Sequence, residues 1–405
     1  MINAAIIGVS GFGRVHYDDL VREYQHKRIN IAGAAIINQD EEKKKCDFLK
    51  STGCQLFTDY KQMLEVLRGK IDICFIPTGI AMHAPMSIAA MRAGANVYVE
   101  KPLAATVQEA AAIHDAEVET GKFVAVGYQT MYQPETRRTK QYLLDGRIGR
   151  VHTLKTYGFW PRNLEYYQRN NWAGQLKNGS AWVLDSPFNN ALAHYLNLLS
   201  FYAGQSFAKP AAIASVQAGL FHAKPITSAD TAWIKAVTAD GKTLLFYVTH
   251  SCAKQEGPVT VICGEHGEIE YDQAKTVIRM KNGEVEEFAS AKDPAVRENI
   301  MDALIDKLRG QHDRFICTLE IAAAQTMICN GAHESCAVHP APPEYVKTIK
   351  DDNGVRLDVI PGIENIILKA FRENRLPDKH DAPWIACGEV IDMTAYTQFR
   401  GGKTE

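Results

Sequence analysis

The 405-residue sequence has no long apolar segment and no marked excess of either charge. None of its apolar runs approaches the ~18 residues that a membrane-spanning helix needs, so we expect no membrane partner. The formal net charge is −2, and such a surface does not attract phosphate chains, so nucleic acid is not an expected partner either. The short apolar start, residues 1–8, lacks a basic leader, which favours a first strand over a signal peptide.

The cysteines also lack the patterns that would indicate a metal site or a disulfide framework. Nine of them are scattered along the chain, and none forms a C-x-x-C pair or lies at zinc-ligand spacing from a histidine couplet. We therefore expect no metal and a reducing, cytoplasmic location. What the sequence does have is an ordinary globular composition, with 46% hydrophobic and 23% charged residues. Its length predicts two domains.

Residues 1–127 alternate short apolar runs with amphipathic stretches, which is typical of parallel strands joined by helices. The expected strands are 3–8, 31–37, 71–76, 96–100 and 123–127, and the expected helices are 14–23, 41–50, 60–67, 84–93 and 107–120. Right-handed crossovers would wind these elements into a doubly wound parallel sheet, the Rossmann fold, with a ligand crevice at the carboxyl ends of the strands. The fold class is α/β.

Residues 128–340 follow a different pattern and are predicted to form a substrate-binding α+β domain. Short strands with glycine punctuation predict a large, mostly antiparallel sheet; they are 211–220, 230–238, 243–250, 258–263, 267–271 and 276–281, after a strand that begins near residue 151. Helices are expected at 136–144, 190–202 and 315–333. The proline-rich residues 341–405 should form an extension that wraps over the domains, with one helix at 363–373. An exposed face of this sheet would pair with another copy, in a homodimer or homotetramer.

A glycine-rich loop follows the first strand and opens the first helix. Its residues are Gly8, Ser10, Gly11, Phe12 and Gly13, so the second glycine of the pattern G-x-G-x-x-G is displaced by one position. Such a loop brings a pyrophosphate onto backbone N–H groups at the positive end of a helix. The pattern predicts a dinucleotide site, and an ordinary strand-to-helix turn is the alternative.

Asn38, at the end of the second expected strand, stands where NAD-binding proteins usually carry an acidic residue. A neutral amide can bond the ribose hydroxyls without repelling a 2′-phosphate. Both NAD and NADP therefore stay open as cofactors, and the lack of an adjacent arginine favours NAD.

A second motif, Glu100-Lys101-Pro102-Leu103, follows the strand at 96–100. With the phosphate loop, the turn Pro77-Thr78-Gly79 and the downstream His83, it resembles the glucose–fructose oxidoreductase, inositol dehydrogenase and rhizopine-catabolism family of dehydrogenases. The resemblance continues, more weakly, through 149–151 and 194–197, so it covers most of the first 205 residues. It implies a nicotinamide cofactor in a crevice formed by the phosphate loop, Asn38, residues 77–79, His83, Glu100 and Lys101.

Lys101 is a candidate catalytic residue on its own chemistry. A lysine at the carboxyl end of a central parallel strand points into the crevice where the nicotinamide is expected. A donor there can polarise a hydroxyl or carbonyl and orient the cofactor. The alternative is a surface lysine at a strand end.

His194 matches the family histidine that exchanges the proton of the substrate hydroxyl. The family motif is Asp-x-Gly-x-His with a second aspartate three residues later, but this chain has Asn190 and Asn197 at the carboxylate positions. Either the amide of Asn190 holds the polyol, or Asp185 supplies the acid through the turn at 186–187. Asn190 and His194 are four residues apart, so we expect them to share one helix face. A histidine has an ordinary pKa near ~6.5, which suits proton transfer at neutral pH.

Aromatic and basic residues gather between Trp160 and Gly174, among them Arg162 and Trp172. Aromatic faces stack on sugar rings, and arginine donors match vicinal hydroxyls, so this segment fits a carbohydrate site. It fits a packed loop beneath the sheet equally well.

The leading functional hypothesis is reversible hydride transfer between NAD(P) and a secondary alcohol of a sugar, sugar acid or cyclitol. One alternative is a glycoside hydrolase that uses tightly held NAD for transient oxidation, and it would show no net reduction of the cofactor. The other is a non-catalytic, cofactor-binding regulator, which would have no need of Lys101 and His194 together.

Overall fold

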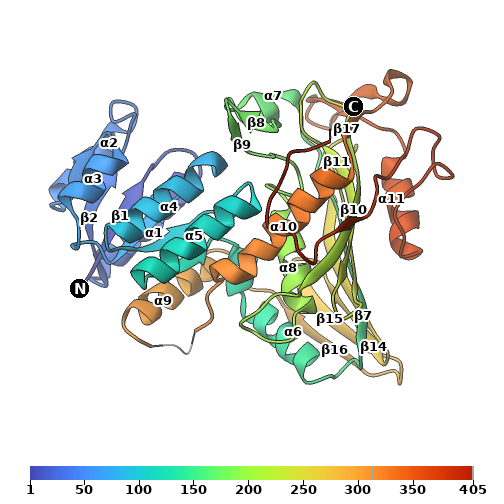
Figure 1. Cartoon of the computed structure of the whole chain (residues 1–405), viewed down its shortest axis with the longest axis horizontal. Helices are drawn as coiled ribbons and strands as arrows, with labels where there is room; N and C mark the ends of the chain where they lie inside the picture. Colours follow the sequence, from blue (N-terminus) through green and yellow to red (C-terminus); the bar gives the residue numbers. More distant parts are fainter. Residues whose placement is uncertain (312–313, 404–405) are drawn as a thin grey trace. The chain divides into compact units, whose positions relative to one another are not determined.

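The computed structural model describes residues 1–311 and 314–403, and these form two compact units (Figure 1). Unit 1 contains residues 1–104, 108–133 and 292–322, and unit 2 contains residues 105–107, 134–291 and 323–405. The division differs from the domain boundaries expected from the sequence chiefly in the second half of the chain. Residues 292–322 return to unit 1, and residues 341–405 are part of unit 2.

The sheet of unit 1 has six parallel strands in the order β3-β2-β1-β4-β5-β6. The strands are β1 (Ile2–Ile7), β2 (Ile29–Ala35), β3 (Gln55–Phe57), β4 (Ile73–Ile76), β5 (Asn96–Val99) and β6 (Val124–Val126). The side chains of the inner strands are almost continuously buried, with all of β4 inside, as expected for parallel strands covered on both faces. Edge strand β3 has no buried residue, whereas all of β6 is buried. This order confirms the predicted Rossmann sheet, and the strand order reverses between β1 and β4.

The helices of unit 1 begin and end within two or three residues of their predicted bounds. They are α1 (Gly13–Gln25), α2 (Lys43–Ser51), α3 (Tyr60–Val66), α4 (His83–Arg92) and α5 (Val107–Thr120). Strand β3 and helix α9 (Ala295–Leu308) were not predicted. Helix α9 packs on α1 through a buried ion pair between Arg297 and Asp19, and Arg28 bonds Asp302 at 2.6 Å.

Unit 2 is built on a ten-stranded sheet in the order β16-β15-β14-β13-β7-β12-β11-β10-β17, with β20 also paired to β10. The strands are β7 (Val151–Phe159), β10 (Ile213–His222), β11 (Thr231–Thr238), β12 (Thr243–Thr249), β13 (Glu256–Gly264), β14 (Gly267–Tyr271), β15 (Lys275–Met280), β16 (Val285–Ala289), β17 (Val338–Pro340) and β20 (Ile391–Asp392). Among the described strands of this sheet, only β12–β7 and β10–β17 pair in parallel. The predicted large, mostly antiparallel sheet is confirmed.

Two helices lie on opposite faces of this sheet (Figure 1). Both α8 (Ala193–Ala203) and α11 (Ile363–Arg372) contact β7 and β12. The remaining helices of the second half are α6 (Pro134–Leu144), α7 (Leu164–Gln168) and α10 (Leu319–Ser335), and two small hairpins are β8–β9 (Lys177–Asn178, Ala181–Trp182) and β18–β19 (Lys347–Lys350, Arg356–Val359).

The face under α11 is an apolar cluster in which the C-terminal residues supply a large share. Ile363, Ile367 and Phe371 of α11 pack with Phe159 and Tyr247 of the sheet. Over β7 and β12 this face is covered by the chain's own C-terminal helix, and pairing of an exposed part of the sheet with another copy stays a prediction. No helix of the described residues has the length and apolar character needed to cross a membrane.

Candidate functional site

The glycine-rich loop of unit 1 connects β1 to α1 in a tight turn. Gly8 has φ +88°, and its N–H donates to Ala35 O at 2.9 Å. A Cβ at Gly13 would lie 2.8 Å from the carbonyl oxygen of Gly8, so only glycine fits there. In the described part of the chain, the N–H groups of Gly11 and Phe12 donate to no acceptor. They lie at the positive end of α1, which suits them to an anion such as pyrophosphate.

Two further segments reach the same edge of the sheet. Pro77, Thr78 and Gly79 follow β4, and Lys101 follows β5 after one intervening residue. Because β1, β4 and β5 are neighbours in a parallel sheet, their carboxyl ends bring these residues to the edge where the phosphate loop lies. The nucleotide-side residues that the sequence predicts therefore share one edge of unit 1.

His83, at the start of α4, is fully buried and connects two of these segments. Its Nδ1 lies 2.7 Å from Pro102 O and its Nε2 lies 3.1 Å from Thr78 O. Burial lowers the pKa of His83, although both carbonyl contacts act in the opposite direction. These contacts fix the Thr78 turn against the peptide that follows Lys101, so His83 orients the crevice and is itself shielded from solvent.

Glu100 is also buried, with 6% of its surface exposed. Its Oε1 lies 2.8 Å from His16 Nε2, and its Oε2 accepts the backbone N–H of Lys101 at 3.1 Å. Burial alone would raise the pKa of Glu100, but the hydrogen bond and charge of His16, with Lys101 and Arg297, lower that pKa to about 2. A Cβ at Gly127 would lie 2.8 Å from Glu100 Oε1, so glycine is needed for this approach.

The sequence does not single out His16. The structure shows that His16, on α1, connects the helix that starts at the phosphate loop with the lysine motif after β5. The sequence offered little indication of this contact, because His16 and Glu100 are 84 residues apart.

Asn38 lies beside the phosphate loop, as its position after β2 predicts. Its Nδ2 donates to Ser10 Oγ at 3.1 Å and to Glu41 Oε2 at 2.8 Å. Ser10 Oγ in turn donates to Glu42 Oε1 at 2.8 Å. Lys45 binds the other oxygen of Glu42 at 2.7 Å. A carboxylate, that of Glu42, thus lies beside Ser10 of the loop, four residues after Asn38.

Glu42 stays ionised in this arrangement. The hydrogen bond from Lys45 is the largest cause of a lowered pKa at Glu42, and the hydrogen bond from Ser10 adds to it. Sequence reasoning missed Glu42 because it looked only at the residue that ends the second strand.

In unit 2, Asp185 and Asn190 form a hydrogen-bonded pair. Asn190 Nδ2 donates to Asp185 Oδ1 at 2.7 Å, and Gly174 N donates to Asp185 Oδ2 at 2.6 Å. Asp185 is 2% exposed. The sequence left Asn190 and Asp185 as alternatives for the family acid. In the structure their side chains are hydrogen-bonded to each other and form one polar group.

His194 is the second residue of α8, which begins at Ala193. The prediction that Asn190 shares this helix is wrong, since residues 187–192 form turns that precede it. Asn190 N donates to Ser186 O at 2.8 Å, and the chain enters the helix through these turns. Asn190 therefore reaches Asp185 and does not project from the helix face that carries His194.

Asn197, one turn further along α8, is fully buried. Neither atom of its side-chain amide has a hydrogen-bond partner among the described residues. Such orphaned polar groups are rare in folded proteins and mark places where a further polar partner is accommodated.

The segment 160–174 places two guanidinium groups around one aromatic ring. Arg162 Cζ is 5.0 Å and Arg169 Cζ is 3.8 Å from the centroid of Tyr166. Arg169 also lies 5.5 Å from the ring of Trp172 and its Nη2 lies 3.9 Å from Asp185 Oδ2. Arg162, Trp172 and Asp185, all expected in the substrate site, are thus connected through Arg169 and Tyr166.

His250 contacts this segment through Tyr167. It is 2% exposed, and its Nδ1 lies 2.7 Å from the hydroxyl of Tyr167. Burial is the main reason that the pKa of His250 falls well below its ordinary value, and the positive charges of Arg162, Lys224 and Arg169 lower it further. His250 is thus a buried residue that supports this segment.

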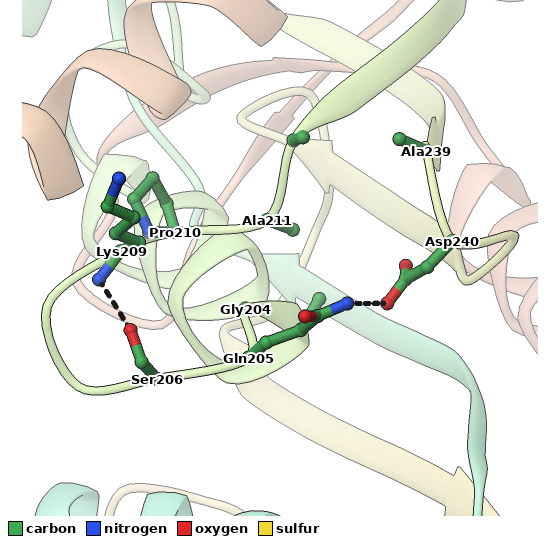
Figure 2. Close-up of a pocket in the computed structure, with 10 residues that line it drawn as sticks. Gly204, Gln205, Ser206, Lys209, Pro210, Ala211, Ala239 and Asp240 are labelled. Atoms are coloured by element: carbon green, nitrogen blue, oxygen red, sulfur yellow. Dashed lines mark hydrogen bonds between the residues drawn. The ribbon is translucent and has the colours of Figure 1, made fainter.

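A separate pocket of about 570 Å³ lies at the other end of α8 (Figure 2). Gln205 donates to Asp240 at 3.2 Å across it, and Lys209 N donates to Ser206 Oγ at 3.2 Å. Its walls start at Ala203, the last residue of α8, whereas His194 is at the first turn. None of the predicted site residues lines it. Within the described residues, no cluster of histidine, cysteine or carboxylate side chains is arranged to hold a metal ion.

Family models match large parts of both units. Residues 2–128 match an oxidoreductase family with an NAD-binding Rossmann fold, and residues 136–270 match a GFO/IDH/MocA C-terminal domain.

Curated relatives share modest identity with this chain. Inositol 2-dehydrogenase of Azotobacter vinelandii is 28% identical over 197 residues, which are 48% of this chain and 53% of that protein. The dTDP-3,4-didehydro-2,6-dideoxy-alpha-D-glucose 3-reductase of Streptomyces violaceoruber is 31% identical over 120 residues, 30% of this chain and 34% of that protein. The chain spans about half of the length of the first relative and a third of the second.

Solved structures resemble the chain over most of its length. The WlbA dehydrogenase of Bordetella pertussis, solved with NADH and UDP-GlcNAcA, has a TM-score of 0.67 at 21% identity and covers 88% of this chain and 98% of its own. An oxidoreductase of Agrobacterium radiobacter, solved with NAD+, L-tartaric acid and magnesium, has a TM-score of 0.66 at 16% identity and covers 82% and 96%. At these identities the likeness concerns the fold alone.

Proposed function

Because the chain belongs to the GFO/IDH/MocA family of NAD-binding oxidoreductases, we propose that it transfers a hydride between a nicotinamide cofactor and a secondary alcohol of a sugar, sugar acid or cyclitol. The observation that carries this proposal is the edge of the unit 1 sheet. There the N–H groups of Gly11 and Phe12 and the lysine motif after β5 come from strands that are close neighbours in one sheet.

The residues present fit a dinucleotide on structural grounds. Gly13 permits the tight turn of the loop, because a Cβ there would lie 2.8 Å from Gly8 O, and the start of α1 has no acidic residue in its first turn to oppose an anion. When bound, the nicotinamide donates or accepts the hydride. The protein contributes position, charge and proton transfer.

Lys101 is proposed to donate a hydrogen bond to the oxygen of the reacting carbon. A positive charge there stabilises negative charge as it develops on that oxygen. Glu100 and His16 are positioning residues, because Glu100 accepts the backbone N–H of Lys101 and is itself fixed by His16.

His194 is proposed to exchange the hydroxyl proton, as a histidine can at neutral pH. The Asp185–Asn190 pair and the orphaned amide of Asn197 supply acceptors and donors for neighbouring hydroxyls. A polyol offers the matching groups, since each hydroxyl both donates and accepts.

NAD is the proposed cofactor in preference to NADP. The carboxylate of Glu42 bonds Ser10, which also bonds Asn38 in the turn after β2. An ionised carboxylate at this place accepts ribose hydroxyls and repels a 2′-phosphate. Lys45, which pairs with Glu42, reduces that repulsion in part.

The relatives support a substrate with several hydroxyl groups. One is an inositol 2-dehydrogenase, another is a reductase of a dTDP-linked deoxy-sugar, and a structural neighbour was solved with UDP-GlcNAcA. These activities belong to those proteins, and they set the panel of compounds to test here.

The experiment is a calorimetric titration with NAD and NADP, followed by an assay of NADH formation on a panel of sugars, sugar acids and cyclitols. We expect NAD to bind and at least one polyol to give net NADH. Binding without net reduction on any polyol, together with hydrolysis of a glycoside, would favour transient oxidation instead. A protein that binds neither cofactor at millimolar concentration would contradict the oxidoreductase proposal.

A further inference from the structure

One face of helix α10 carries buried side chains that can form hydrogen bonds. Gln325, Cys329 and His333 follow one another at intervals of four residues, so they lie on the same face of the helix. Each has at most 1% of its surface exposed. An amide buried in this way costs free energy unless it is hydrogen-bonded. The face therefore serves specific contacts as well as packing.

These contacts all reach one short segment of unit 2, residues Phe188 and Asn189 in the turns before α8. Gln325 Nε2 donates to Phe188 O at 3.0 Å and to Asn189 Oδ1 at 3.1 Å. Cys329 Sγ lies 3.8 Å from Phe188 O, and the ring centroid of His333 lies 5.5 Å from that of Phe188. Helix α10 thus holds one place of the chain through three side chains.

Asn189 extends this contact to a strained part of the backbone. Its Nδ2 donates to Val183 O and to Leu184 O, both at 3.2 Å. Leu184 has φ +52°, in the left-handed region that a side chain of this size rarely adopts. Such a conformation persists where the surrounding structure holds it. The Gln325–Asn189 hydrogen bond belongs to the contacts that hold the chain here.

The same turns determine where α8 begins and where His194 lies. Leu192 N donates to Pro187 O at 2.7 Å, which closes the last turn before the helix. The helix starts at Ala193, so His194 is its second residue. Because residues 187–192 are turns bonded to one another, a shift of Phe188 and Asn189 is passed along the backbone to the first turn of α8.

We propose that Gln325 is a positioning residue, which fixes the turn before α8 through Phe188 and Asn189 and thereby the imidazole of His194. This inference rests on the proposed function, in which His194 exchanges the proton of the substrate hydroxyl. Gln325 is fully buried and acts only through these contacts. A displacement of a reacting group by about 1 Å can lower a rate ~100-fold, so a remote hydrogen bond of this kind affects the chemical step.

The kinetic test is a double-mutant cycle in the full-length protein, with a polyol that the wild type oxidises. Gln325→Met keeps the length of the side chain and removes the amide donor. We expect it to lower kcat by ~10–100-fold and to change the Kd of NAD by less than ~2-fold, because NAD is assigned to unit 1. In His194→Ala the same substitution should lower kcat by less than ~2-fold further, since a residue that acts through His194 has nothing left to position.

Ile328→Val is the matched control. Ile328 is fully buried on the same helix, so the substitution lowers folding stability without the loss of a hydrogen bond. It should keep wild-type kcat, and urea titrations of each variant separate a loss of stability from a loss of position. If Gln325→Met does not fold, Asn189→Ala removes the same hydrogen bond from the other side and should show the same coupling to His194→Ala.

Hydrogen exchange tests the contact without an assay of activity. Peptides that span residues 184–194 report the exchange of the backbone N–H groups in these turns by mass spectrometry. In Gln325→Met we expect the exchange to be ~10-fold faster or more than in wild type, because the turns open locally once the amide bond is lost. Ile328→Val should leave the rates unchanged.

Three results would overturn the positioning role. They are a loss of kcat from Gln325→Met that is equal with and without His194, an equal loss of kcat in Ile328→Val, and unchanged exchange of residues 184–194 in Gln325→Met. If His194→Ala keeps wild-type kcat, the role of His194 and this inference fail together. If the wild type oxidises no polyol while Gln325→Met exchanges faster, the proposed function fails and the hold of Gln325 on the turn is confirmed.

Discussion

The two compact units form their parts of the candidate site in different ways. In unit 1 the candidate site consists mainly of backbone, with N–H groups of the Gly8–Gly13 loop and turns at the carboxyl ends of β1, β4 and β5. In unit 2 it consists of side chains from a long connection, Arg162 to Asn190, held by aromatic and carboxylate contacts. The positions of backbone groups in unit 1 are fixed by the sheet. In unit 2 a single substitution can change the groups that the site presents.

This difference explains how one fold serves many substrates. The nucleotide side requires glycines and a strand order, so it tolerates few changes. The substrate side requires only that some polar groups converge, so function resides in particular residues and not in the fold. The four predictions that follow test this contrast, from the largest expected effect to the smallest.

Loss of either proposed catalytic group should have the largest effect. We expect Lys101→Ala and His194→Ala each to lower kcat by ~10²–10⁴-fold, the usual contribution of a positioned acid or base. Affinity for NAD should change far less. The double variant should lose less than the product of the two single effects, because residues that act on one reacting group are not additive. Steady-state kinetics and calorimetry measure the two quantities.

Matched controls are Lys70→Ala, an exposed lysine of unit 1, and His114→Ala, an exposed histidine of α5. Both should keep wild-type kcat. Near-wild-type kcat in His194→Ala would show that the proton leaves by another group. Asp185 is then the next candidate, because it is the buried carboxylate that bonds Asn190 just before α8.

Gly13→Ala should damage the backbone site while unit 2 stays unchanged. The added Cβ would lie 2.8 Å from Gly8 O and 3.1 Å from Gly8 C, and these backbone atoms leave little room to adjust. We expect NAD affinity to fall by ~10-fold or more, as measured by calorimetry. Gly402→Ala is the control, because its Cβ would meet only ordinary contacts, at 3.7 Å and beyond. Unchanged NAD affinity in Gly13→Ala would contradict the assignment of the phosphate loop.

Most of unit 1 could be predicted from the sequence because its signals are local. The loop, the lysine motif and the alternation of apolar runs each lie within a few residues, and helix α5 begins and ends where its periodicity indicated. Helix α9 was not predicted as part of this unit, since its Arg297 meets Asp19 across 278 residues of chain.

The substrate side was less predictable because its contacts join residues that are not close in the sequence. Its residue types were identified, but the bond between Asp185 and Asn190 depends on turns that end just before α8, and the periodicity placed the helix three residues too early. Glu42 and His16 were missed because their partners, Ser10 and Glu100, lie 32 and 84 residues away. Contacts of this range depend on the register of the sheet, which a local pattern does not contain.

Glu42→Gln should change the selectivity between NAD and NADP while the phosphate loop keeps its structure. Without its negative charge, residue 42 no longer repels the 2′-phosphate of NADP, and Lys45 is released from its ion pair. We expect the ratio of the NADP and NAD dissociation constants to fall by ~10-fold, as measured by calorimetry. Glu65→Gln, on α3 and at an exposed ion pair with Arg68, should leave the ratio unchanged. Asn38→Asp should raise the ratio of the two dissociation constants. If neither Glu42→Gln nor Asn38→Asp changes this ratio, the ribose does not bind at these residues.

The smallest expected effect is on the folding stability of unit 2. It concerns a lysine at the C-terminal end of α8, the helix that carries His194. Lys140 is fully buried, and its Nζ donates to Phe201 O at 2.7 Å and also to Gly204 O, where α8 ends. Burial lowers the pKa of Lys140 from 10.5 to about 7. Between these two values the unfolded chain binds a proton that the folded protein does not, so the contribution of this lysine to folding stability must increase as the pH rises.

Lys140→Met removes that titration along with the two bonds to the helix end. From pH 7 to pH 10 we therefore expect the free energy of unfolding of wild type to rise relative to that of Lys140→Met, by roughly 1 kcal/mol or more. Urea titrations at several pH values measure the difference, and Lys281→Met, at an exposed lysine, should show no such trend. A constant difference between wild type and Lys140→Met would mean that Lys140 remains protonated in the folded protein. The end of α8 would then be held by a charge, and the buried amine would contribute to the orientation of the helix at every pH in this window.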